Sequence, residues 1–123
     1  MGEQKQKLVY LCTHGPEDPE KAILPFSMAL GAMAMDFEAV VILQSGAVLL
    51  AMKCAADHVL AAGMSPLKEQ LDIFLADGGK LIACTACLSA RKIEKGMLDE
   101  RIQVGSVASL AKEFSEATNV ICY

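Results

Sequence analysis

The chain of 123 residues has no tryptophan, and aromatic residues make up only 5% of it. Charged residues are also scarce, at 21%, and they form no basic stripe, since the net charge is −4. Affinity for nucleic acids depends largely on clustered lysine and arginine, so a nucleic-acid partner is excluded. The longest uncharged runs, 22–35 and 39–52, are shorter than the roughly 20 residues that cross a bilayer. We expect no membrane association.

The cysteines are too few and too scattered for a secreted disulfide scaffold, and their number, five, is odd. The N-terminus also lacks the pattern of a secretory signal, because Glu3, Lys5 and Lys7 precede only a brief apolar run. We therefore expect a cytoplasmic protein with mostly free thiols. A second CxxC or a histidine pair at ligand spacing is missing as well, which argues against structural zinc. We expect no metal and no organic cofactor.

Hydrophobic residues are abundant, at 54% of the chain. A folded chain of this length cannot hide all of that apolar surface by itself, and exposed patches invite association. The composition therefore predicts a homo-oligomer.

Apolar runs alternate with helix-forming segments and are separated by turn residues. The predicted strands are Leu8–Thr13, Phe37–Gln44, Lys80–Cys84, Ile102–Val104 and Val120–Tyr123. The predicted helices cover 19–35, 47–56 and 67–77, the segment from Cys84 to near Lys95, and 107–117. Apolar strands joined by helical crossovers indicate an α/β fold, a three-layer α/β/α sandwich around a mainly parallel five-stranded sheet with flavodoxin-like layering. We expect a single domain over 1–123.

In such a sheet, ligands bind beyond the carboxyl ends of the strands, so residues that follow each strand are site candidates. They are Cys12, Thr13 and His14 after the first strand, Ser45 and Gly46 after the second, Cys84 to Cys87 after the third, and Gly105 and Ser106 after the fourth. We predict that Thr13, Gly15, Ser45, Gly46 and Ser106 bind the ligand.

Cys84 is the candidate nucleophile, because the start of a helix favours the thiolate over the thiol. Cys87, three residues later, could form a disulfide with Cys84, and His14 could supply a proton or a positive charge. The other three cysteines, Cys12, Cys54 and Cys122, lie in apolar contexts and are predicted to pack in the core.

The same positions resemble the DsrE/DsrF-like sulfur-relay family over nearly the whole chain. The matching segments are Thr13-His14-Gly15-Pro16 after the opening strand, the Ser45-Gly46 turn, Pro66-Leu67 with Glu69 and Leu71, and Leu81-Ile82-Ala83-Cys84 followed by Cys87 and Arg91.

This resemblance implies that Cys84 carries a sulfane sulfur as a persulfide between donor and acceptor proteins, within a trimer or hexamer. A sulfurtransferase activity would follow, with Cys87 and His14 in supporting roles. Two alternatives remain open: an oligomeric ligand-binding module without catalysis, and a dithiol redox protein that uses the CxxC pair.

Overall fold

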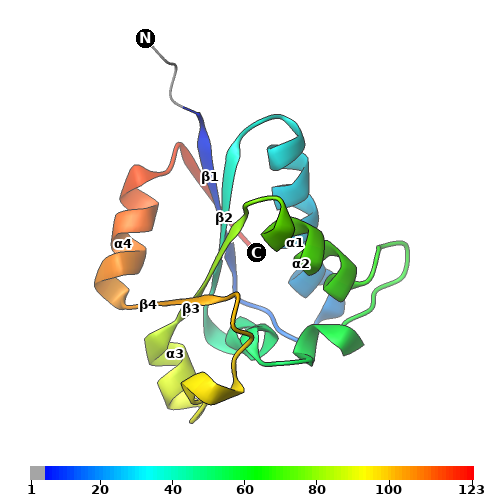
Figure 1. The fold of residues 1–123 in the computed structure, drawn as a ribbon, viewed down its shortest axis with the longest axis vertical. Helices are drawn as coiled ribbons and strands as arrows, with labels where there is room; N and C mark the ends of the chain where they lie inside the picture. Colours follow the sequence, from blue (N-terminus) through cyan, green and yellow to red (C-terminus); the bar gives the residue numbers. More distant parts are fainter. Residues whose placement is uncertain (1–4) are drawn as a thin grey trace.

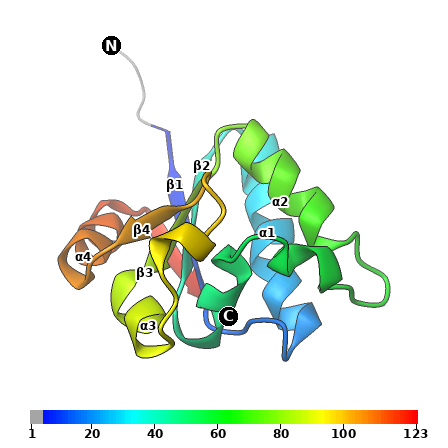
Figure 2. The same cartoon turned by 60° about the horizontal axis from the view of Figure 1, so that its bottom comes forward.

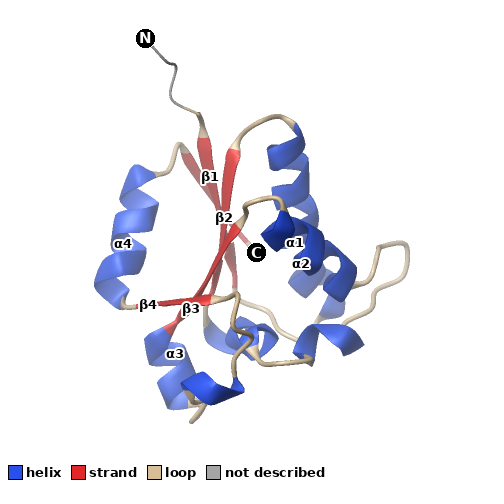
Figure 3. Cartoon of the chain, viewed as in Figure 1, coloured by secondary structure: helices blue, strands red, loops and turns tan. Residues whose placement is uncertain are grey.

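The computed structural model describes residues 5–123, so Glu3, cited above against a secretory signal, lies outside the described residues. Those residues form five strands, four α-helices and three 3-10 helices (Figures 1 and 3). In chain order the elements are β1 (Lys7–Cys12), α1 (Pro19–Ala34), β2 (Glu38–Leu43), η1 (Ser45–Ala51), η2 (Ala55–His58), α2 (Leu67–Ala76), β3 (Lys80–Cys84), α3 (Thr85–Ala90), η3 (Lys95–Met97), β4 (Gln103–Gly105), α4 (Val107–Glu116) and β5 (Asn119–Cys122).

The strands form one sheet in the order β4-β3-β2-β1-β5, and every neighbouring pair is parallel. Helices α1 and α2 cover one face of this sheet and α4 covers the opposite face (Figure 1). The α/β fold with a parallel five-stranded sheet is therefore confirmed. The single domain over 1–123 stays a prediction.

The core lies between the central strands and the helix pair α1 and α2. Residues 39–43 of β2 are buried without interruption, as expected for a strand covered on both faces. Phe26 of α1 meets Phe74 of α2 edge to face, with ring centroids 5.9 Å apart. At the start of α1, the Asp18 carboxylate accepts the Lys21 N–H at 3.2 Å and Pro19 occupies the first turn, which fixes where this helix begins.

The predicted helix over 47–56 is wrong. The segment forms two short 3-10 helices, η1 and η2, separated by an extended stretch at Met52. Met52 forms an antiparallel bridge with Leu98, and the Lys53 N–H donates to the Met97 carbonyl at 3.0 Å. Pairing with this distant segment holds the backbone extended, and tertiary contact thereby overrides the local helix preference.

The helix after Cys84 is also shorter than predicted, because it ends at Ala90 rather than near Lys95. Lys92 takes a left-handed conformation with a φ of 55°, and the Ile93 N–H returns to the Leu88 carbonyl at 3.0 Å. The turn lets Ile93 enter the core, where its side chain is buried. Burial of one apolar residue therefore ends this helix early.

Some of the apolar surface predicted from composition remains uncovered. Met28 of α1 is 49% exposed, and Met35, at the end of the helix, is 68% exposed. These two do not belong to the core. Among residues 5–123, no helix has the length and apolarity that crossing a bilayer requires.

A buried carboxylate ties α4 to the amino-terminal end of the sheet. Glu113 of α4 lies 2.8 Å from the Lys7 ammonium of β1 and 2.7 Å from the Lys80 ammonium of β3. Burial raises the pKa of Glu113, but the hydrogen bonds from the two lysines outweigh it and hold the pKa below its usual value. The ionised form therefore stabilises the fold.

Glu113→Gln is expected to lower the free energy of unfolding by about 2 kcal/mol at neutral pH, because two lysines lose their buried counter-charge. Because the pKa of Glu113 is lowered in the folded state, its stabilisation is fully present above the unfolded-state pKa of about 4.3. It is lost as the pH falls through the folded-state pKa. The difference from wild type should therefore shrink in acid. Urea denaturation at neutral and acidic pH measures this.

Glu116→Gln is the matched control, since Glu116 lies on the same helix with its side chain 48% exposed and 3.4 Å from Lys7. It should cost less than about 0.5 kcal/mol. Equal effects of the two variants would contradict the role of the buried pair.

Candidate functional site at the carboxyl edge of the sheet

The parallel strands bring the ends of β1, β2 and β3 to one edge of the sheet. Figure 2 turns this edge forward and shows α3 and η1, the segments that follow β3 and β2. These two helices are in contact with each other. The residues predicted from strand ends therefore share one edge, but the structure divides them into smaller groups.

The CxxC pair lies where β3 passes into α3. Cys84 is the N-cap residue of α3 and Cys87 lies in its first turn. Cys84, the predicted nucleophile at this edge, is instead buried, with 3% of its surface exposed. Its place at the end of a central strand explains this, since neighbouring segments cover it. Cys87 is half-buried and is therefore the more open thiol of the pair.

The Cys87 sulfur is held by the backbone of the neighbouring turn. The Ser45 N–H of η1 donates to Cys87 Sγ of α3 at 3.2 Å. Ser45 adopts a left-handed conformation with a φ of 54°, which is uncommon for a residue other than glycine. This contact fixes the position of the Cys87 sulfur beside the turn that follows β2.

Gly15 and Gly46 bring the β1–α1 and β2–η1 turns together. A Cβ atom at position 15 would overlap the Gly46 carbonyl oxygen, so only glycine fits there. The Glu17 carboxylate accepts the Gly15 N–H, with both oxygens 3.0 Å from the nitrogen, and lies beside Gly46. Sequence reasoning missed Glu17, since only the tertiary contact of the two turns shows where its carboxylate lies.

Thr13 and His14 lie at a different part of the edge from the CxxC pair. Thr13 Oγ1 donates to the Tyr123 carbonyl at 2.6 Å and lies 3.3 Å from His14 Nδ1. The strand order reverses direction between β1 and β5, so this is the topological switch point of the sheet. Within residues 5–123, no hydrogen bond joins the His14 ring to Cys84 or Cys87.

Ser106 lies beyond β4, where it has a structural partner. Its hydroxyl oxygen accepts the Ser109 N–H at 3.2 Å, which makes it the N-cap of α4. Thr85, the first residue of α3, donates to the Gly105 carbonyl at 3.2 Å. Ser106 therefore starts a helix, and its predicted part in ligand binding stays a prediction.

The remaining cysteines differ in burial. Cys12 is fully buried, as predicted, and burial raises the pKa of its thiol to about 11. Cys54 and Cys122, predicted to lie in the core, are both exposed, so that prediction is wrong. Cys54 follows the Met52–Leu98 bridge in a left-handed conformation, and Cys122 lies on β5 at the edge of the sheet.

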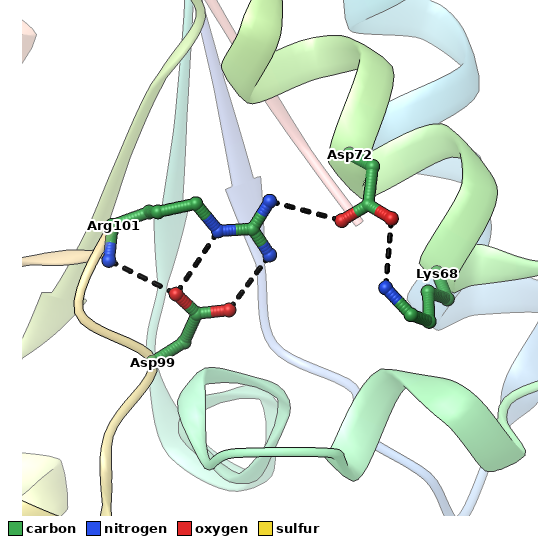
Figure 4. Close-up of polar contacts among 4 residues, drawn as sticks. All are labelled: Lys68, Asp72, Asp99 and Arg101. Atoms are coloured by element: carbon green, nitrogen blue, oxygen red, sulfur yellow. Dashed lines mark hydrogen bonds and ion pairs between the residues drawn. The ribbon is translucent and has the colours of Figure 1, made fainter.

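A second polar cluster joins α2 to the segment before β4 (Figure 4). Arg101 donates to Asp99 Oδ1 at 3.1 Å, to Asp99 Oδ2 at 2.7 Å and to Asp72 at 2.9 Å, while Lys68 pairs with Asp72 at 2.7 Å. These groups line a cavity of about 310 Å³ that Cys54 also borders. The hydrogen bonds from Arg101 hold the pKa of Asp99 below its usual value. The four charges satisfy one another, which fits a clamp between the two segments.

The family model described as DsrE/DsrF-like matches residues 6–123. The chain belongs to the DsrE/DsrF-like family. No curated protein matches this DsrE/DsrF-like chain at a significant level.

Two solved structures resemble this DsrE/DsrF-like protein over almost the whole length of both partners. The ychN protein from E. coli superposes with a TM-score of 0.80 at 19% identity, covering 96% of this chain and 99% of its own. MTH1491 from Methanobacterium thermoautotrophicum, described as a protein of unknown function, gives a TM-score of 0.74 at 17% identity, covering 98% and 100%. At these identities the likeness supports the shared fold.

The burial of the five cysteines predicts an order of alkylation in the native protein. Exposed Cys54 and Cys122 should react first, Cys87 next, and buried Cys84 more slowly. Cys12 should react at least about a hundredfold more slowly than Cys122, because it is both covered and protonated. Timed iodoacetamide labelling, followed by peptide mass analysis, measures all five rates. Labelling of Cys12 as fast as Cys122 would contradict this packing.

Proposed function

We propose that this DsrE/DsrF-like protein is a sulfur carrier that accepts a sulfane sulfur as a cysteine persulfide and passes it to an acceptor thiol. Membership of the family supports a role related to sulfur relay. The observation that carries the proposal is the CxxC pair at the carboxyl edge of β3, with the Cys87 sulfur 3.2 Å from the Ser45 N–H. A thiol that is open and held by an N–H donor is suited to attack on sulfur.

Cys87 is the residue that meets the donor, because it is half-buried whereas Cys84 is 3% exposed. Its thiolate attacks the outer sulfur of a donor persulfide. A new S–S bond forms at Cys87, the donor S–S bond breaks, and the donor leaves as a thiolate. The Cys87 persulfide keeps the proton of the transferred S–H group, so no external oxidant or reductant is needed.

Cys84, the sulfur carrier that the family resemblance implies, receives the sulfur in a second exchange. Its thiolate attacks the outer sulfur of the Cys87 persulfide, and Cys87 is released as a thiolate. Burial of Cys84 would shield the resulting persulfide from oxidation. The sulfur returns through Cys87 to the acceptor by the reverse step. His14, a supporting proton donor in this proposal, lies on the β1–α1 turn, which β2 separates from the CxxC segment.

The proposed working form is a cytoplasmic homo-oligomer, a trimer or a hexamer. Apolar side chains that the isolated chain leaves exposed support this, among them Met28, Met35, Val107 and Val120. Separate donor and acceptor proteins would bring and remove the sulfur.

The experiment uses a background variant, Cys54→Ser with Cys122→Ser, because both exposed thiols would otherwise take up sulfur without being part of the site. Incubated with glutathione persulfide, the background protein is expected to gain the mass of one sulfur atom. Cys87→Ser in this background should slow the gain at least about tenfold, because the open thiol is lost. Intact-mass spectrometry measures the gain and peptide mapping locates it.

Cys84→Ser in the same background is the companion variant. It should still acquire sulfur, but on Cys87 and with faster loss to added thiol. If the background protein gains no sulfur, or gains it equally without both cysteines, the proposal is wrong. A Cys84–Cys87 disulfide formed with release of hydrogen sulfide would instead indicate dithiol redox chemistry, which the CxxC spacing also permits.

A further inference from the structure

The contacts around Cys87 extend beyond the CxxC segment to a carboxylate on the first turn. Cys87 Sγ accepts the Ser45 N–H, and Ser45 precedes Gly46. Gly46 packs against Gly15 so closely that no side chain fits at position 15. Glu17 bonds the Gly15 N–H through both carboxylate oxygens. A continuous set of contacts therefore leads from Glu17 to the sulfur.

We propose that Glu17 is a positioning residue for Cys87. Its carboxylate fixes the β1–α1 turn against the β2–η1 turn, and this contact keeps the Ser45 N–H on the Cys87 sulfur. The inference rests on the proposed function, in which Cys87 is the thiol that meets the sulfur donor.

The Glu17 carboxylate also lies next to the second turn, beside Gly46. Glu17 Oε1 would lie 3.3 Å from a Cβ atom at position 46, so the carboxylate sits directly beside that residue. Ser45, one residue earlier, is left-handed, with a φ of 54°. A non-glycine residue leaves this conformation readily unless its surroundings hold it. The two turns supply that restraint, and Glu17 links them.

The hydrogen bond, rather than the negative charge, is the property that positioning requires. Positioning depends on the Glu17 oxygens that accept the Gly15 N–H and so keep the β1–α1 turn against Gly46. A glutamine at position 17 would keep an acceptor oxygen without the charge, whereas an alanine would keep neither. Comparison of Glu17→Gln with Glu17→Ala therefore separates the hydrogen bond from the charge.

The test compares Glu17→Ala and Glu17→Gln with wild type by the rate of iodoacetamide labelling at Cys87, relative to Cys54 in the same molecule. Glu17→Ala is expected to slow Cys87 about fivefold, the effect of losing one N–H bond to sulfur. Glu17→Gln should stay within about twofold of wild type, because an amide oxygen still accepts the Gly15 N–H. Glu20→Ala, an exposed carboxylate in the first turn of α1, is the matched control and should change nothing.

Faster labelling of Cys87 in Glu17→Ala, or an unchanged rate, would overturn the inference. Equal slowing of Cys87 labelling in Glu17→Gln and Glu17→Ala would overturn it too, because the hydrogen bond to the Gly15 N–H would then not explain the effect. Melting curves confirm that each variant is folded.

Gly15→Ala tests the same contact from the other side: if folded, it should slow Cys87 as well, and a wild-type rate would contradict the role of the Gly15–Gly46 contact.

Labelling requires no sulfur donor, so the two proposals fail separately. Loss of sulfur uptake in the wild-type background, with the Glu17 effect intact, would remove the sulfur-carrier function and leave the positioning role. Normal sulfur uptake with no effect of the Glu17 variants would remove the positioning role and leave the sulfur-carrier function.

Discussion

Parallel hydrogen bonding of β1, β2 and β3 is the constraint on which the candidate site depends. Parallel strands start at the same edge and end at the same edge, so three turns that are far apart in sequence lie side by side. The register places Cys12 beside Leu43 and Leu43 beside Ala83. The residues after these positions, including Gly15, Ser45 and Cys87, come into reach of one another for this reason.

The turns themselves are joined by backbone groups more than by side chains. A glycine at 15 permits close approach to the Gly46 carbonyl, and the Ser45 N–H bonds Cys87 directly. Backbone contacts of this kind depend on the sheet being rigid beneath them. Two sets of opposite-charge contacts contribute to that rigidity: Glu113 with Lys7 and Lys80 at the amino-terminal end of the sheet, and Arg101 with Asp72 and Asp99 in the segment before β4.

The two thiols of the CxxC pair differ in exposure because of where β3 ends. Cys84 is the last residue of a central strand, so neighbouring segments cover it, while Cys87 lies one helical turn further on. The spacing alone gives no reason to distinguish the two thiols. Burial separates them, leaving one open to solvent and one enclosed, and a carrier of reactive sulfur can use both conditions.

Apolar runs and turn residues are local signals, so the sequence alone predicts the α/β class. It also predicts all five strands to within about a residue or two and the CxxC pair at the end of β3. Other features depend on distant partners. Pairing of Met52 with Leu98 replaces a predicted helix by η1 and η2, and burial of Ile93 shortens α3. The exposure of each cysteine and the place of Glu17 were likewise decided by packing, since burial is a property of segments brought together and no local pattern records it.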